Sequence, residues 1–158
     1  NRIRLPLEIA AAVADVWGSG NVGYRVSPVG AFNDMSDSDP VATFGALAKG
    51  LSDLGLGYIH VAEAFAGQER DAATCEAVRK AFDGVYIANG GYTAETGAAL
   101  IASGGADAIA YGTLFISNPD LPARMQQGGP YNDADQATFY GGTEKGYTDY
   151  PALEATAT

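Results

Sequence analysis

Apolar and polar positions follow two different periods along the chain, and their succession predicts helices that alternate with short strands. Apolar residues recur at helical spacing in four segments, residues 3–17, 41–54, 71–82 and 93–103. Short runs typical of strands lie between and after them, at 22–27, 58–61, 85–88 and 106–111. Asn118-Pro119 resembles a helix start and predicts a short helix through Met125, and the Gly-, Tyr- and Asp-rich residues 126–158 are expected to form a loop.

This order predicts the α/β class, because strands separated by helices pair in parallel through right-handed crossovers. The pattern alone leaves two architectures open, a small doubly wound sheet and part of a (β/α)8 barrel. A complete barrel needs about 200–250 residues, so four βα units in 158 residues correspond to half of one. No linker or change of composition divides the chain, and residues 1–158 are expected to form one half-barrel ending in the loop 126–158.

Composition excludes several classes of function. The formal net charge of −10 argues against nucleic-acid binding, since the chain has no cluster of basic residues to offset it. No apolar run reaches the length of about 18–20 residues that a membrane span needs, and the first residues lack the pattern of a signal peptide. The single cysteine, Cys75, is interpreted as a packing residue, and no metal-site spacing occurs. A cytoplasmic protein is therefore expected.

Candidate chemistry lies at the carboxyl ends of the predicted strands, where ligands bind in both architectures. Two of these ends place glycine shortly before a helix, at Asn89-Gly90-Gly91 and at Gly112-Thr113. Free backbone N–H groups and the helix dipole favour an anion at such a position. The pair is interpreted as a phosphate cradle, and tight turns without a ligand are the alternative.

Three further side chains belong to the same strand ends. Arg25 has two interpretations, a salt bridge at the rim of the sheet or a permanent cation directed at negative charge on a ligand. His60 is a candidate general base, although a packing or hydrogen-bonding role is favoured. Glu63 has no evident carboxylate partner, so a glycosidase-type pair has weak support.

Five motifs occur in chain order: R-V-S-P (25–28) followed by Gly30 and F-N (32–33), N-G-G-Y-T (89–93), G-T-L-F-I-S-N-P-D-L (112–121), T-F-Y-G-G (138–142) and G-Y-T-D-Y-P (146–151). Together they resemble the Old Yellow Enzyme family of FMN-dependent ene-reductases, including its N-ethylmaleimide and glycerol trinitrate reductases. The resemblance covers essentially the whole chain in the right order. It implies the C-terminal half, strands five to eight, of a TIM (β/α)8 barrel that binds FMN non-covalently and uses NAD(P)H.

The resemblance also implies roles for individual residues. Arg25 matches the arginine beside the flavin N1/C2-carbonyl region, where a fixed guanidinium stabilises the anionic reduced flavin. The expected cofactor contacts are Arg25, Asn89, Gly90, Gly91, Gly112, Thr113 and Phe139, and Phe32 and Tyr140 match aromatic residues that border the substrate. The implied substrates are activated alkenes (enones, maleimides, nitroalkenes) or nitrate esters.

Two departures from the family pattern stand out. The usual G-R at the last strand end is here Gly112-Thr113, which replaces a charged phosphate contact with a neutral one. The family's proton-donor tyrosine and substrate-binding His/Asn pair belong to the barrel half that this chain does not match, so no catalytic residue is assigned here. The open edges of a half-barrel predict completion by a complementary N-terminal polypeptide.

Two other functions remain open at this stage. One is a non-catalytic half-barrel module that binds phosphate or flavin. The other is a phosphate-handling barrel isomerase that uses His60 or Glu63 as its base.

Overall fold

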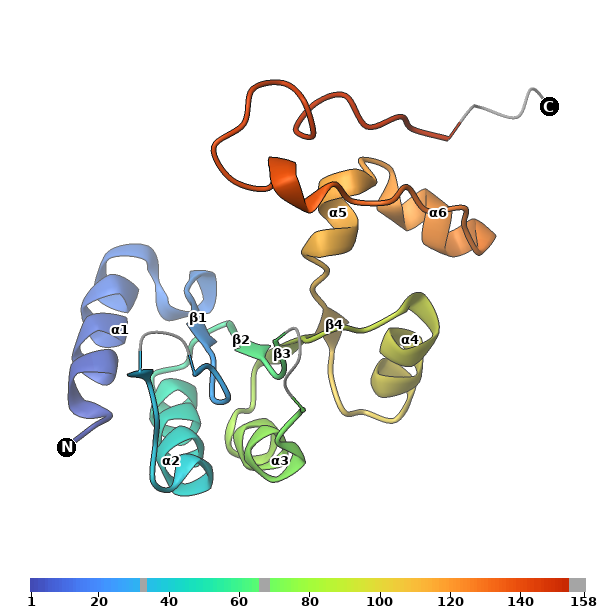
Figure 1. The fold of residues 1–158 in the computed structure, drawn as a ribbon. Helices are drawn as coiled ribbons and strands as arrows, with labels where there is room; N and C mark the ends of the chain where they lie inside the picture. Colours follow the sequence, from blue (N-terminus) through green and yellow to red (C-terminus); the bar gives the residue numbers. More distant parts are fainter. Residues whose placement is uncertain (32–33, 66–68, 154–158) are drawn as a thin grey trace. The chain divides into compact units, whose positions relative to one another are not determined.

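The structure, a computed structural model, describes residues 1–31, 34–65 and 69–153. Helices and strands alternate through residue 109, as the sequence pattern predicts (Figure 1). The elements are α1 (Arg4–Trp17), η1 (Ser19–Asn21), β1 (Gly23–Val26), α2 (Pro40–Asp53), β2 (Tyr58–Ala62), α3 (Ala72–Ala81), β3 (Val85–Asn89), α4 (Ala94–Ala102), β4 (Ala108–Ile109), α5 (Thr113–Ser117), α6 (Leu121–Gln127) and η3 (Gln136–Thr138).

The four strands form one sheet in the order β1-β2-β3-β4, and every neighbouring pair is parallel. Arg25 is the register partner of His60, which pairs in turn with Ile87. Helices α2 and α3 lie along one face of the sheet (Figure 1). Sequential parallel strands joined by helices are the geometry of consecutive βα units, and the α/β prediction is confirmed.

The core lies between this helical layer and one face of the sheet. Alternate strand residues point to the same face, and Ile59, Val61, Tyr86 and Ala88 are all buried. They belong to one cluster with Leu47, Ala48 and Leu51 of α2, Val78 of α3 and Ala10 of α1. The helical spacing of the apolar residues in 41–54 therefore marks the side of α2 that packs on the sheet.

The opposite face of the sheet carries the remaining strand residues. Tyr58 and Val85 are 42% and 46% exposed, at the amino ends of β2 and β3. Arg25 and His60 lie further along the same face, because they alternate with buried residues of β1 and β2. This face holds the polar side chains of the candidate site at its carboxyl end.

Side-chain caps define the starts of three helices. The carboxylates of Asp39 and Asp71 accept backbone hydrogen bonds at the first turns of α2 and α3. Thr93 and Thr96 form a reciprocal capping box at the start of α4. Thr93 is thus the N-cap of α4, at the start of the helical segment 93–103 predicted from the sequence.

The C-terminal segment differs from the sequence prediction at its helices. Helix α5 begins at Thr113, in a stretch for which no element was predicted, and α6 begins at Leu121 rather than at Pro119. Asn118 does not cap the following helix. Its buried side chain instead donates to the carbonyl of Leu114 and accepts from the backbone N–H of Asn132. The predicted helix start at Asn118-Pro119 was wrong because this side chain closes α5.

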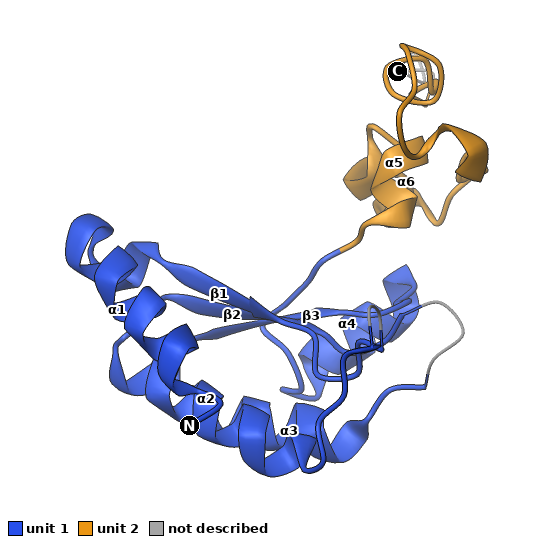
Figure 2. Ribbon diagram, turned by 60° about the vertical axis from the view of Figure 1, so that its left-hand side comes forward, with its two compact units in different colours: residues 1–110 blue, residues 111–158 orange. Residues whose placement is uncertain are grey.

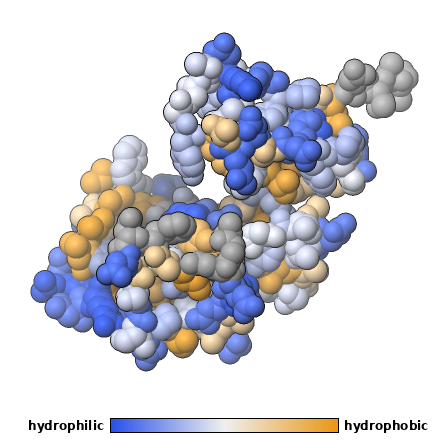
Figure 3. Space-filling model, viewed as in Figure 1, coloured by the Kyte–Doolittle hydropathy of each residue, from blue (hydrophilic) through white to orange (hydrophobic). Residues whose placement is uncertain are grey.

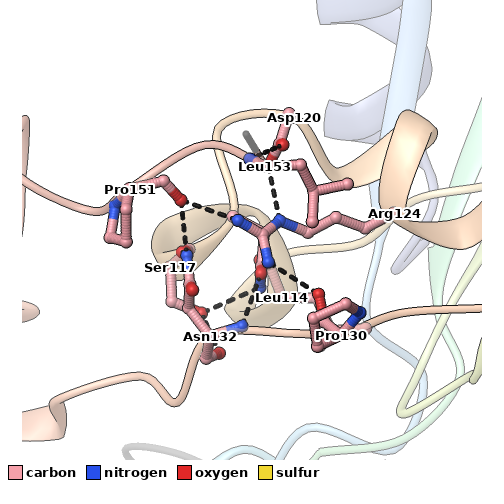
Figure 4. Close-up of polar contacts among 9 residues, drawn as sticks. Leu114, Ser117, Asp120, Arg124, Pro130, Asn132, Pro151 and Leu153 are labelled. Atoms are coloured by element: carbon pink, nitrogen blue, oxygen red, sulfur yellow. Dashed lines mark hydrogen bonds and ion pairs between the residues drawn. The ribbon is translucent and has the colours of Figure 1, made fainter. Parts of the chain in front are cut away.

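Arg124 connects α6 to the irregular tail (Figure 4). Its side chain is 3% exposed and donates to the Asp120 carboxylate at 2.6 Å. The two terminal nitrogens donate to the carbonyls of Pro130 at 2.6 Å and Pro151 at 2.7 Å. The guanidinium thus organises residues far apart in the tail, which contains the 3-10 turn η3 between them.

The chain divides into two compact units, residues 1–110 and 111–158 (Figure 2). The boundary falls just after β4, and no change of composition marks it. Within the described ranges, no helix combines the length and apolar character needed to cross a membrane.

Candidate functional site

Three polar side chains meet at the carboxyl end of the first unit's sheet. The guanidinium of Arg25 lies 2.6 Å from Nε2 and 3.0 Å from Nδ1 of His60. A second guanidinium nitrogen donates to Oδ1 of Asn89 at 3.4 Å. The amide of Asn89 donates in turn to the carbonyl of Ala110 at 2.8 Å. Arg25, an exposed residue of β1, is therefore held by side chains of β2 and β3, and among the described residues it forms no ion pair with a carboxylate.

The contact with Arg25 defines the state of His60. A guanidinium can only donate hydrogen bonds, so the imidazole nitrogen that receives one must be unprotonated. Partial burial lowers the pKa of His60 below its usual value of 6.5, and the charge of Arg25 lowers it further. His60 is thus a neutral acceptor that orients Arg25, in line with the favoured hydrogen-bonding role.

The turn between β3 and α4 brings two predicted phosphate-binding residues beside this cluster. Gly90 packs closely on the chain after β2, since a Cβ at this position would lie 2.8 Å from the backbone nitrogen of Ala64. Gly91 has φ +73°, and a Cβ there would meet nothing within 4 Å. A side chain would thus disturb the packing at Gly90 and the left-handed backbone at Gly91. The turn presents bare backbone to the space around Gly91.

The second glycine turn belongs to the second unit. Gly112 is the N-cap residue of α5 and Thr113 is its first residue, and both are exposed. A Cβ at Gly112 would meet no atom within 4 Å. The amides at the start of a helix have no partner inside it, so this turn has the features predicted for an anion contact, without a fixed charge.

The aromatic residues expected near the flavin and substrate have different surroundings. Tyr140 is 92% exposed, and Phe139 just before it is half-buried at the end of η3. Phe32 lies outside the described residues. The second unit contains two basic residues that could take the place of the missing phosphate arginine. Arg124 is buried, with its guanidinium bound to groups of the tail, whereas Lys145 is exposed.

Glu63 has hydrogen-bond partners that the sequence did not indicate. Glu63, 1% exposed, receives hydrogen bonds from Arg70, Tyr86 and Tyr92. Its partners are a guanidinium and two phenols rather than the second carboxylate of a glycosidase-type pair.

The family model of the NADH:flavin oxidoreductase / NADH oxidase family matches residues 1–132 of the chain. The chain belongs to this family. The match includes the strands that carry Arg25, His60 and Asn89 and both glycine turns. The match confirms the Old Yellow Enzyme resemblance and supports FMN as the flavin cofactor of the family, whose name also includes the nicotinamide NADH.

Named relatives agree with this assignment. The chain is 38% identical to 12-oxophytodienoate reductase 2 of Arabidopsis thaliana, over 99% of this chain and 43% of the relative. The structure of morphinone reductase in complex with tetrahydroNAD matches with a TM-score of 0.89 at 42% identity, over 98% of this chain and 42% of that one. The old yellow enzyme from Trypanosoma cruzi matches with a TM-score of 0.91 at 36% identity, over 97% and 41%.

The coverage defines what part of the fold is present. The chain spans 43% of the Arabidopsis relative, and its sheet is parallel, so it is a partial piece of the Old Yellow Enzyme barrel. The doubly wound alternative is therefore set aside.

The residues of this piece fit the family's cofactor. FMN needs a cation near its ring system and backbone donors near its phosphate. Arg25 offers the first in a fixed orientation, and the turn at Gly90 and Gly91 offers the second where side chains would interfere.

Proposed function

We propose that this chain is the flavin-binding C-terminal half, strands five to eight, of an ene-reductase of the Old Yellow Enzyme family. The observation that carries the proposal is the Arg25 guanidinium, held by His60 and Asn89 at the carboxyl end of a parallel sheet. The family resemblance assigns the matching arginine to the N1/C2-carbonyl region of the flavin. When bound, FMN supplies hydride transfer from a reduced nicotinamide to an activated C=C bond.

Arg25 acts by electrostatics in this proposal. Its charge is permanent, and both contacts fix it before a ligand arrives. A prearranged cation stabilises developing negative charge without a cost of reorientation at the moment of reaction. Because His60 is neutral, it holds Arg25 without cancelling that charge.

The remaining proposed contacts follow the family pattern. The backbones of Gly90, Gly91 and Gly112 bind the phosphate, and the Thr113 hydroxyl adds a neutral hydrogen bond. Phe139 contacts the ring system of the flavin. Phe32 and Tyr140 border the substrate, and the high exposure of Tyr140 leaves its ring available for such a contact.

The proposed substrates are enones, maleimides, nitroalkenes or nitrate esters. The names 12-oxophytodienoate reductase and morphinone reductase denote carbonyl compounds, which supports an electron-withdrawing oxygen on the substrate. The proton donor and the residues that bind this oxygen belong to the rest of the barrel in this proposal.

Exposed apolar surface supports completion of the barrel by further strands. β1 and β4 are the outer strands of the described sheet, and Tyr58 and Val85 lie exposed on its open face. Hydrophobic residues also gather over α1 (Figure 3), where exposed Leu5, Ile9, Val13, Val16 and Trp17 share one side of the helix. The proposal includes the prediction made above that the completing strands belong to a separate polypeptide.

The test is made on the chain together with the rest of its barrel. We expect a bound yellow flavin, and oxidation of NADPH or NADH that depends on cyclohexenone or N-ethylmaleimide. Arg25→Gln should lower the rate of flavin reduction and the affinity for FMN, and Arg25→Lys should restore part of both. Arg2→Gln is the matched control, because Arg2 is an exposed arginine whose ion pair is with Asp37.

The possible results separate the candidate functions. Flavin binding without alkene-dependent oxidation of the nicotinamide would support the non-catalytic module. Absence of bound flavin would contradict both flavin functions. Equal effects of Arg25→Gln and Arg2→Gln would contradict the role assigned to Arg25.

A further inference from the structure

Glu63 is a buried carboxylate that the proposed chemistry does not use. It follows β2 directly and is 1% exposed. Tyr86 donates to its Oε1 at 2.6 Å, Arg70 donates to both oxygens at 2.8 and 3.3 Å, and the Tyr92 hydroxyl donates to Oε2. Burial by itself would raise the pKa of Glu63, but these donors outweigh it and lower the pKa. The group is thus an ionised, fully hydrogen-bonded carboxylate.

These contacts reach both sides of the Gly90-Gly91 turn. The backbone N–H of Glu63 donates to the carbonyl of Asn89 at 2.7 Å, immediately before the two glycines. Its carboxylate binds the hydroxyl of Tyr92, immediately after them. The same segment lies beneath the turn, because a Cβ at Gly90 would approach the nitrogen of Ala64. One residue therefore holds the chain before and after the glycine pair.

A glycine pair needs such support if its amides are to bind an anion. Glycine has the largest backbone freedom of any residue, so an unsupported turn loses entropy when a ligand orders it. Backbone donors that are already oriented avoid this loss and bind more tightly. Gly91 has no neighbour at its Cβ position, so the orientation of the turn depends on its flanking contacts.

We propose that Glu63, through the hydroxyl of Tyr92, is the positioning group of the phosphate-binding turn at Gly90 and Gly91. The inference rests on the proposed function, in which this turn binds the phosphate of FMN. Glu63 itself touches neither the cofactor nor the substrate in this role.

Tyr86 provides a control for Tyr92 among the hydrogen-bond donors to Glu63. Tyr86 and Tyr92 donate to the same carboxylate, but Tyr86 belongs to β3 and is 0% exposed, whereas Tyr92 lies in the turn. Removal of either hydroxyl deprives Glu63 of one donor. Only removal of the Tyr92 hydroxyl releases the glycine pair.

The experiment compares Tyr92→Phe with Tyr86→Phe in the complete barrel. Dissociation constants of FMN and of riboflavin, which lacks the phosphate, are measured by quenching of flavin fluorescence. We expect Tyr92→Phe to weaken FMN binding about tenfold, the size of one lost hydrogen bond to a charged group, and to leave riboflavin binding unchanged. Tyr86→Phe should lower the melting temperature and preserve the ratio of the two affinities. Amide hydrogen exchange at Gly91 in the flavin-free protein should become faster in Tyr92→Phe alone.

The outcomes distinguish this inference from the function on which it rests. If wild type does not bind FMN more tightly than riboflavin, the proposed phosphate site fails and the inference fails with it. If wild type prefers FMN and Tyr92→Phe keeps that preference, only the positioning role is overturned. Glu63→Gln, which removes the charge but keeps the size, provides a second variant and should also lower the preference for FMN.

Discussion

Arg25 and His60 are direct register partners in β1 and β2, and the guanidinium of Arg25 lies 2.6 Å from Nε2 of His60. The contact requires a neutral imidazole, because both groups would otherwise only donate. It places a permanent cation beside an acceptor that does not neutralise it. Asn89, from the next strand along the sheet, holds the other side of the guanidinium at 3.4 Å.

The first prediction concerns acid stability. Burial and the charge of Arg25 lower the pKa of His60 below the usual value of 6.5, which the residue regains on unfolding. Between these two pKa values the unfolded chain binds a proton that the folded chain does not. The stability contributed by neutral His60 is therefore fully present above pH 6.5 and is lost as the pH falls through the folded pKa.

The measurement is the free energy of unfolding by urea over a pH series, for wild type and for His60→Asn. His60 is the single histidine of this sequence, so the difference between the two proteins isolates its titration. We expect the advantage of wild type to shrink below pH 6.5. An advantage that grows on acidification would show that His60 is protonated in the folded protein.

The second prediction concerns the neutral residue at the second glycine turn. Thr113→Arg should tighten FMN binding by roughly one to two powers of ten, because a charge-assisted phosphate contact replaces a neutral one. Riboflavin binding should not change. Unchanged or weaker FMN binding in Thr113→Arg would place the phosphate elsewhere.

The third prediction concerns the buried guanidinium of α6. Arg124→Met removes the guanidinium donor from the carbonyl of Pro130 and leaves the carbonyl of Pro151 with the Asn132 amide alone. We expect a loss of about 3 kcal/mol in the free energy of unfolding, since the buried guanidinium makes three charge-assisted hydrogen bonds that the variant lacks. Lys80→Met is the control, because its ion pair with Glu76 is exposed and should matter little. Equal stability of the two variants would contradict this role of Arg124.

The fourth prediction concerns the open sheet. The outer strands β1 and β4 and the exposed Tyr58 and Val85 should make the 158-residue chain self-associate when produced alone. Sedimentation should show dimers or larger species that disappear when the rest of the barrel is present. A folded monomer would contradict the prediction.

The order of the elements could be predicted because it depends on local signals. Leu47 and Leu51 recur at helical spacing and are both buried, and Thr93 caps a helix as its sequence context indicates. Helix α5 could not be predicted in this way. Its start depends on no side-chain cap, and its end is closed by Asn118, whose side chain also binds Asn132.

In the candidate site, too, the positions of residues could be predicted from the sequence but their distant partners could not. Position alone suggested Arg25 and the glycines, because residues just after parallel strands share one edge of the sheet. The partners of Arg25 could not be read from the sequence, because His60 and Asn89 lie 35 and 64 residues away. The Glu63 network was missed for the same reason, since Tyr86 and Tyr92 follow it by 23 and 29 residues.

The sequence by itself determined the α/β order, the helix starts with local caps, the family motifs and the departure at Thr113. All of these depend on neighbouring residues or on chain order. Only the tertiary structure decided that Arg25 is held by a neutral histidine and that Glu63 is an ionised carboxylate. The carboxylate accepts hydrogen bonds from Arg70, Tyr86 and Tyr92. The physical reason is that the protonation state and orientation of a side chain depend on burial and on partners that folding brings from distant strands.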